Sequence, residues 1–274
     1  MAQNLLVAAA PFAAGTLGDP TTLRGISLGF VAFCLASGAM YAFNDAADAD
    51  ADRLHPVKAN RPVASGRLTR SSAIRFGFGL GVAGFAVATT TMSLAFVAIL
   101  AVYVMSSLLY TFHFRSVPVM DILVIAFGFL LRALAGGAIA GVALSPWFMA
   151  VTVGGATFVS AGRRLSELRK SETAGSHRPV LDEYGETSIV WIVFGSGAIV
   201  AASYLGWAVV VAAPVNANAW SIASCVPFLI GLVRYGWLII SGRAERPEIA
   251  ATTDAVLLAA GAAWLITLVL TIYS

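Results

Sequence analysis

The chain has 274 residues, of which 59% are hydrophobic and only 11% are charged. A soluble domain of this length would carry about a quarter charged residues and would interrupt its apolar runs with polar faces. The mean hydropathy of +0.84 therefore excludes an ordinary soluble domain, a disordered chain and a disulfide-rich secreted module. The composition predicts an integral membrane protein.

Apolar runs, most of them near the length of about 20 residues that a spanning helix needs, follow one another along the chain. They cover residues 26–43, 73–91, 94–112, 120–140, 147–161, 188–213, 220–240 and 255–273, and a shorter run over 5–18 precedes them. These runs do not alternate with the period of a strand, which argues against a transmembrane barrel. The sequence therefore predicts an all-α polytopic membrane protein of nine transmembrane helices, folded as a single domain over residues 1–274.

The charges indicate the orientation of these helices. With nine spans and an inner N-terminus, the inner loops are 44–72, 113–119, 162–187 and 241–254. Of the 17 basic residues, only Arg24 then lies on the outer side, as the positive-inside rule expects. Of the 14 acidic residues, only Asp19 lies there, which that rule does not require. The polar chemistry is concentrated in two inner loops, which favours a cytoplasm-facing active site over a channel or a symmetric carrier.

The first long inner loop begins with closely spaced carboxylates. If the helix over 26–43 continues into the loop, Asp45, Asp48 and Asp52 fall at positions i, i+3 and i+7. They then lie within roughly 60° of one another, whereas Asp50 points to the other side. Three carboxylates on one face repel one another unless a divalent cation neutralises them. Oxygen ligands alone favour Mg²⁺, which commonly bridges to substrate phosphates.

Cationic residues follow these carboxylates: His55, Lys58 and Arg61. Such groups suit phosphate oxygens, so the loop predicts a site for a metal ion and a phosphate together. One alternative is an EF-hand calcium loop, but the glycine and the glutamate of that loop are missing at the required positions. The other alternative is a solvated acidic loop.

The second long inner loop begins with Gly162-Arg163-Arg164, and Glu167 follows. On a helix, Arg163 and Arg164 lie four and three residues before Glu167, so all three share a face. One acid with two arginines is a weaker metal site and a stronger anion site. An exposed, ion-paired helix end is the alternative.

The first loop resembles a known family. Asn44-Asp45-x-x-Asp48-x-x-x-Asp52, extended by His55-Pro56-x-Lys58-x-x-Arg61-Pro62-x-Ala64-Ser65-Gly66, is similar to the first aspartate-rich motif of the UbiA superfamily of intramembrane prenyltransferases. The resemblance implies a nine-helix bundle with a cytoplasmic active site. It also implies that Asp45, Asp48 and Asp52 are the catalytic carboxylates, which hold the Mg²⁺ that binds the donor diphosphate.

The second loop departs from most of the superfamily, whose members carry a second Asp-x-x-x-Asp motif. Gly162-Arg163-Arg164-x-x-Glu167, followed by Arg178 and Glu183-Tyr184, resembles the decaprenyl-phosphate phosphoribosyltransferases, as does Gln3-Asn4-Leu5-Leu6-Val7. Gln3 stands where that group usually has lysine, so the resemblance implies no lysine contact to a donor phosphate at this position. These enzymes of the bacterial plasma membrane transfer phosphoribose from 5-phosphoribosyl diphosphate (PRPP) to a polyprenyl phosphate, releasing pyrophosphate. Their product supplies the lipid precursor of cell-wall arabinan.

The residues and the resemblance together predict the donor site. Its members would be Asn44, His55, Lys58, Arg61, Tyr110, Arg163, Arg164, Glu167, Arg178 and Tyr184. The Mg²⁺ of the first loop suits the diphosphate, and the arginines of the second loop suit the 5-phosphate. For Tyr110, a place in the aromatic belt at the membrane interface is the alternative.

Two arginines lie inside predicted spans. Arg132 is costly there unless it is paired or faces a polar cavity, so we expect it to contact the acceptor phosphate, with Asp121 as a candidate neighbour. Arg234 lies near enough to the inner surface to extend its guanidinium into it. Cys34 and Cys225 both fall inside spans and imply no disulfide.

Two other classes of function compete with this interpretation. A prenyltransferase that moves a prenyl group from a prenyl diphosphate to an aromatic acceptor would need the second aspartate pair. A transporter would place ionisable groups near the membrane midplane or on both faces. Basic residues interleaved with acids give no support to nucleic-acid binding. We expect an enzyme whose partners are PRPP, a polyprenyl phosphate and the bilayer; homo-oligomerisation is left open.

Overall fold

The structure is a computed structural model that describes residues 2–54, 58–91, 93–114, 117, 119–174, 186–212 and 219–273. These residues form helices and the turns between them, and the described part of the chain contains no strand. Three predicted site residues, His55, Arg178 and Tyr184, lie outside the described residues, so their roles stay predictions.

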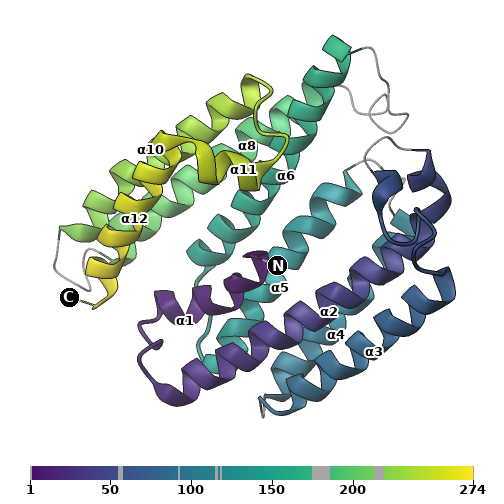
Figure 1. Cartoon of the computed structure of the whole chain (residues 1–274). Coiled ribbons are helices and arrows are strands. Elements are labelled where there is room, and N and C mark those ends of the chain that lie inside the picture. The colour runs from purple at the N-terminus through teal and green to yellow at the C-terminus, as the bar shows by residue number, and fades with distance from the viewer. Residues whose placement is uncertain are drawn as a thin grey trace. The chain divides into compact units, whose positions relative to one another are not determined.

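The helices are α-helical except for two 3₁₀ segments, η1 and η2, and two π-helical segments, η3 and η4. In chain order they are η1 (Ala2–Ala8), α1 (Ala9–Ala13), α2 (Pro20–Arg53), η2 (Lys58–Asn60), α3 (Arg70–Thr89), α4 (Leu94–Leu109), η3 (Tyr110–Phe114), α5 (Met120–Ala140), α6 (Pro146–Ala174), α8 (Glu186–Gly206), η4 (Trp207–Ala212), α10 (Trp220–Ile240), α11 (Pro247–Thr253) and α12 (Ala255–Tyr273) (Figure 1).

Among the described residues, seven helices are long and apolar enough to cross a membrane. They cover Pro20–Arg53, Arg70–Thr89, Leu94–Phe114, Met120–Ala140, Glu186–Val210, Trp220–Ile240 and Ala255–Tyr273. The predicted all-α polytopic membrane fold is therefore confirmed.

The two other predicted spans have a different character. The N-terminal run forms a short apolar helix over Gln3–Ala13. The run over 147–161 belongs to α6, which has 29 residues because the helix continues through the charged stretch after Gly162. The count of nine spans stays a prediction.

The chain divides into two compact units, and α5 contributes to both. The first comprises Met1–Arg115 and Leu131–Ala143, and the second comprises Ser116–Leu130 and Leu144–Ser274. Each unit has a hydrophobic core of its own. The single domain over residues 1–274 stays a prediction.

In the first unit, α2 packs along α3 and also contacts α4 (Figure 1). Its core contains Phe33 and Phe96, both fully buried, whose ring centroids lie 5.9 Å apart in an edge-to-face arrangement. Side-chain oxygens of Asp19, Thr69 and Ser93 accept the backbone N–H groups that begin α2, α3 and α4. These caps satisfy donors that the first turn of each helix leaves without an intrahelical partner.

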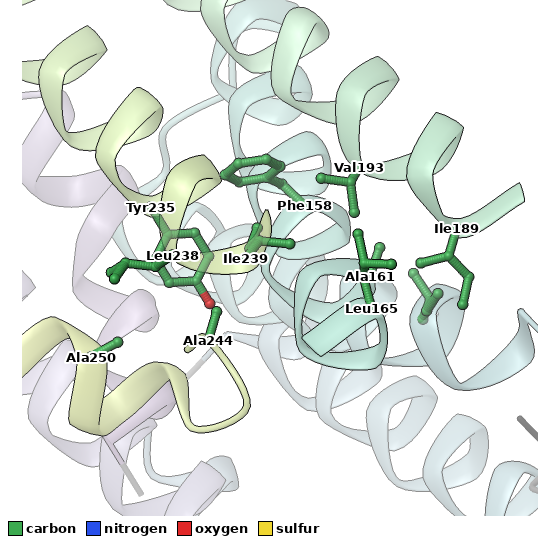
Figure 2. Close-up of a cluster of buried hydrophobic side chains, with 11 residues drawn as sticks. Phe158, Ala161, Leu165, Ile189, Val193, Tyr235, Leu238, Ile239, Ala244 and Ala250 are labelled. Carbon is green, nitrogen blue, oxygen red and sulfur yellow. The ribbon is translucent and has the colours of Figure 1, made fainter. Parts of the chain in front are cut away.

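In the second unit, α6 packs along α8, and α10 packs along α12. Figure 2 shows the core: Phe158, Ala161 and Leu165 of α6 lie among side chains of α8 and α10. Phe158 and Tyr235 meet edge to face, with ring centroids 5.8 Å apart. This core fixes the part of α6 that leads into the predicted arginine site.

The N-terminal segment approaches α5 closely in the first unit. A Cβ added at Gly136 would lie 1.9 Å from the carbonyl oxygen of Val7, which is fully buried. That distance is far below van der Waals contact, so only glycine allows the two backbones to pack in this way.

Gly136→Ala should therefore destabilise the protein by about 1–3 kcal/mol, because the new methyl group overpacks against backbone that cannot turn away. Gly79→Ala in α3 is the matched control: nothing lies within 4 Å of its added Cβ. It should be neutral or stabilise by up to about 1 kcal/mol, from the higher helix propensity of alanine. Thermal unfolding in detergent micelles measures both, and equal melting temperatures for the two variants would contradict the close approach.

Candidate active site

The C-terminal end of α2 carries the carboxylates predicted to hold a metal ion. Nη1 of Arg61 lies 3.1 Å from Oδ1 of Asp45 and 2.9 Å from Oδ2 of Asp52. One guanidinium nitrogen thus reaches both carboxylates, so Asp45 and Asp52 share a face, as their helical spacing predicts. Nζ of Lys58 lies 3.8 Å from Oδ1 of Asp52. Asp48 stands between them in the sequence and is half-buried.

Asp50 belongs to a separate group, as its position on the helix predicts. Its carboxylate is largely exposed and pairs with Nη1 of Arg53 at 3.0 Å and with Nη2 of Arg70 at 2.5 Å. These two arginines do not pair with Asp45 or Asp52 in any described contact. Asp50 therefore provides a control carboxylate within the same loop.

The arrangement of the carboxylates suits one kind of metal site. In the part of the chain that the structure describes, no three Asp, Glu, His or Cys side chains are grouped closely enough to hold a metal ion. The described residues therefore form no complete cage of protein ligands. The position of Arg61 nevertheless shows that one positive centre can reach Asp45 and Asp52 together. This donor set fits Mg²⁺, which is usually bound by one or two carboxylates with waters and substrate phosphates.

The turn after η2 brings Lys58 and Arg61 back onto α2. Val63 is buried at its centre, in a small cluster that also contains Ala46 and Ala49 of α2 and Ala73 of α3. Gly66 has a φ of +79°, a left-handed conformation that glycine adopts without strain. The Pro62-x-Ala64-Ser65-Gly66 part of the motif therefore has a structural role: it closes the turn that positions the two cations.

Asn44 is bound by Thr111, the residue that follows Tyr110. The hydroxyl of Thr111 donates a hydrogen bond to the side-chain oxygen of Asn44. Thr111 is buried and follows Tyr110 in the π-helical segment η3. This hydrogen bond connects the π-helical segment that contains Tyr110 to α2 at Asn44, the residue before Asp45. The aromatic-belt alternative for Tyr110 is not tested by this contact.

The second predicted site lies on α6. Glu167 binds both arginines, one on each oxygen: Nε of Arg163 is 3.1 Å from Oε1, and Nη1 of Arg164 is 2.6 Å from Oε2. Nε of Arg164 also lies 2.5 Å from Oδ2 of Asp121 in α5. Burial opposes the charge on Arg164, but Glu167 and Asp121 outweigh it and raise the pKa of this guanidinium above its ordinary value.

Several guanidinium N–H groups of this site have no hydrogen-bond partner in the described part of the chain. Among the described residues, Nη2 of Arg164 and both Nη groups of Arg163 make no hydrogen bond. Carboxylates thus bind only Nε of Arg163 and only Nε and Nη1 of Arg164 among the described contacts. The remaining donors match the oxygens of a phosphate.

The charged part of α6 is held against the end of α10. A Cβ at Gly162 would lie 2.3 Å from Cδ1 of Ile239, so glycine lets the two helices approach closely. The hydroxyl of Ser166 donates to the carbonyl of Ile239 at 3.3 Å, and Nη1 of Arg169 donates to the carbonyl of Ile240 at 2.5 Å. These contacts hold the turn of α6 that carries Arg163 and Arg164.

Asp121 is absent from the predicted donor site. It lies 43 residues before Arg164, and local spacing carries no information about contacts at that separation. The only signal was that it is an acid beside a predicted inner boundary, which suggested Arg132 as its partner. The described contacts pair it with Arg164.

Arg132 is buried in the first unit, with 3% of its surface exposed. Its Nε donates to Oδ1 of Asn4 at 2.8 Å, and its Nη2 donates to the hydroxyl of Tyr103 at 3.2 Å and to that of Ser37 at 3.4 Å. The guanidinium also lies over the Tyr103 ring, 4.7 Å from its centroid. The cost of this charge is thus reduced by hydrogen bonds and a cation–π contact. A contact with the acceptor phosphate stays a prediction.

Arg234 does not simply extend into the membrane surface. Its Nε lies 3.1 Å and 3.2 Å from the two carboxylate oxygens of Asp254, and its Nη2 lies 2.7 Å from Oδ2. Asp254 also accepts the backbone N–H of Leu257 and so caps α12. The expectation for Arg234 missed this pairing because Asp254 belongs to a different helix boundary, 20 residues away.

The comparisons with known proteins agree with this fold. The profile of the UbiA prenyltransferase family matches residues 5–259. The chain belongs to the UbiA prenyltransferase family. Its fold resembles that of a UbiA homologue from Archaeoglobus fulgidus solved with GPP and Mg²⁺, with 18% sequence identity and a TM-score of 0.61 over 100% of this chain and 97% of that chain. A UbiA homologue from Aeropyrum pernix has 19% identity and a TM-score of 0.65 over 97% of each chain. At these identities the likeness establishes the fold.

Curated relatives are more similar in sequence. The decaprenyl-phosphate phosphoribosyltransferase of Corynebacterium glutamicum is 34% identical over an alignment of 280 residue positions, gaps included, which covers 99% of this chain and 83% of the relative. The enzyme of that name from Mycolicibacterium smegmatis is 36% identical over 286 residues, which cover 99% of this chain and 89% of the relative.

Arg61 should compete with a divalent cation for Asp45 and Asp52. Arg61→Gln should therefore tighten the binding of Mn²⁺, used as a probe without donor, by about fivefold, since a partly exposed ion pair is worth about 1 kcal/mol. Electron paramagnetic resonance of free and bound Mn²⁺ measures this. Arg70→Gln, which removes a partner of Asp50, should leave Mn²⁺ affinity unchanged. Weaker Mn²⁺ binding in Arg61→Gln would mean that Arg61 supports the metal site instead of competing with the metal.

Proposed function

We propose that this protein is a Mg²⁺-dependent transferase that moves the 5-phosphoribosyl group from PRPP to decaprenyl phosphate or a similar polyprenyl phosphate, releasing pyrophosphate. The observation that carries the proposal is the pair of guanidinium groups that Glu167 holds on α6. A prenyl diphosphate needs a second metal-binding carboxylate pair in this loop, whereas PRPP needs a site for a further phosphate. Relatives that are 34–36% identical over nearly the whole chain carry the name of this activity.

The first loop would bind the diphosphate of the donor. Asp45, Asp48 and Asp52 would hold Mg²⁺, which when bound supplies positive charge to the diphosphate and to the departing pyrophosphate. Lys58 and Arg61 would exchange their carboxylate contacts for contacts with diphosphate oxygens. Asn44, fixed by Thr111, would help to orient the donor, with Tyr110 from the same π-helical segment beside it.

The second loop would bind the 5-phosphate of the donor. Arg164 and Arg163 present N–H groups that have no partner among the described residues. The carboxylate of Glu167 keeps both guanidinium groups on one face of α6, which suits a ligand that must contact them together. Arg178 and Tyr184 of the same loop would complete the site.

The proposed reaction needs no strong general base. An oxygen of the acceptor phosphate would attack C1 of the ribose, and the bond between C1 and the pyrophosphate oxygen would break, with the electron pair leaving on pyrophosphate. The transition state would resemble an oxocarbenium ion, as in other glycosyl transfers. The acceptor phosphate is already an anion near neutral pH. The contribution of the protein is therefore to stabilise the departing charge and to orient the two substrates.

The charge distribution supports a place in the bacterial plasma membrane, with the N-terminus and both charged loops in the cytoplasm. PRPP is water-soluble and the acceptor is a lipid, so an enzyme that joins them needs its polar loops at the membrane surface. Arg132 would contact the phosphate of the acceptor lipid.

The activity is tested by incubating purified protein with radiolabelled PRPP and polyprenyl phosphate, with and without EDTA. We expect a labelled lipid that forms only when Mg²⁺ is present. A parallel incubation with a prenyl diphosphate and an aromatic acid tests the other enzyme class. Product from that second incubation alone would replace the proposal with an aromatic prenyltransferase.

Asp45→Ala and Asp48→Ala should each lower turnover by at least about 100-fold, because each removes charge that holds the metal ion at the developing pyrophosphate. Initial rates of labelled-lipid formation measure this. The matched control is Asp50→Asn, since Asp50 lies in the same loop but pairs with Arg53 and Arg70. It should retain activity within about twofold. Activity of Asp45→Ala close to that of the control would exclude this metal site.

A further inference from the structure

Asp121 holds a position that the proposed function does not yet use. It is the second residue of α5, and only 8% of its surface is exposed. One carboxylate oxygen, Oδ1, accepts the backbone N–H of Ile122 at 2.9 Å. The other, Oδ2, accepts Nε of Arg164 at 2.5 Å. The helix terminus thus fixes the carboxylate, and the carboxylate fixes the arginine.

The two carboxylates around Arg164 restrict different motions. Glu167 lies three residues away on the same helix and binds Nη1. This contact alone would let the two side chains move together over the surface of α6. Asp121 binds Nε from a different helix of the same unit. A planar guanidinium bound at Nε and at Nη1 by groups on two helices has a defined plane and direction. Its Nη2 group, which has no partner among the described residues, is then the donor available to a ligand.

Among the described residues, the charges of this group balance one another. Arg163 and Arg164 contribute two positive charges, and Asp121 and Glu167 contribute two negative charges. These four residues therefore do not attract an anion through an excess of positive charge. The affinity of the site depends on the direction of the free N–H groups, which makes the orientation of Arg164 decisive.

We propose that Asp121 is a positioning residue, which orients Arg164 to bind the 5-phosphate of the donor. The inference rests on the proposed function for the identity of the donor, but its geometry requires only that a phosphate binds at Arg164. Asp121 itself would not touch the substrate.

The alternative is that Asp121 only clamps α5 to α6, and the chain offers a matched residue with that role. Asp254 also lies at the start of a helix, accepts a backbone N–H there and binds an arginine of another helix, Arg234. Arg234 is outside both proposed substrate sites. Asp254→Asn therefore reports the cost of losing such a clamp without a change in phosphate binding.

The first measurement is steady-state kinetics of Asp121→Asn, Asp254→Asn and the wild type at varied PRPP. We expect Asp121→Asn to raise the KM for PRPP by about tenfold with kcat within about twofold, because binding remote from the reacting bond is lost. Asp254→Asn should lower the melting temperature but keep the KM of the wild type. In an Arg164→Ala background, Asp121→Asn should have no further effect on KM, because the residue through which it acts is gone.

The second measurement uses inorganic phosphate alone as the probe. Phosphate should raise the melting temperature of the wild type and of Asp254→Asn, and raise that of Asp121→Asn clearly less. If the wild type shows this pattern but transfers no phosphoribose, the proposed function fails and the positioning role stands. If the phosphate response and the KM of Asp121→Asn match those of Asp254→Asn, Asp121 is only a clamp. An undiminished effect of Asp121→Asn on KM in the Arg164→Ala background would also overturn the proposal.

Discussion

A guanidinium group held between two carboxylates is the interaction that organises the charged groups of α2 and of α6. In the first unit Arg61 joins Asp45 to Asp52, and in the second unit Arg164 joins Glu167 to Asp121. Asp52 and Glu167 expose only 5% and 14% of their side chains, and carboxylates so poorly solvated are costly unless they are paired. The pairing therefore lets carboxylates gather at the two places where we propose that the phosphates of the donor bind. The same contacts decide which N–H groups remain available.

The two groups use this interaction for different purposes. Arg61 projects from a turn and is 39% exposed, which suits the proposed exchange of its guanidinium for a metal ion at Asp45 and Asp52. Arg164 projects from a helix that close contacts fasten to α10, is 24% exposed and is held from two directions. A displaceable arginine suits a metal and diphosphate site, and a fixed arginine suits recognition of a phosphate that takes no part in bond breaking.

Helical periodicity in a sequence predicts contacts between residues of the same helix. Helical spacing alone placed Asp45 and Asp52 on one face, separated Asp50 from them, and put Arg163, Arg164 and Glu167 together. It could not find the pairs Asp121–Arg164 and Arg234–Asp254, because each joins two helices whose packing is decided by the core. Hydropathy located the apolar half of α6 but not its continuation, since a helix does not end where its apolar residues end.

The contact of Arg61 with Asp45 and Asp52 has a practical consequence. Many small metal-binding domains unfold when a chelator removes their ion, because nothing else neutralises the ligands. Here the chain carries its own counter-ion for two of the carboxylates, supplied by a turn whose backbone is closed independently around Val63 and Gly66. Purification in the presence of a chelator should therefore leave the protein folded, with its activity restored when the divalent cation is returned.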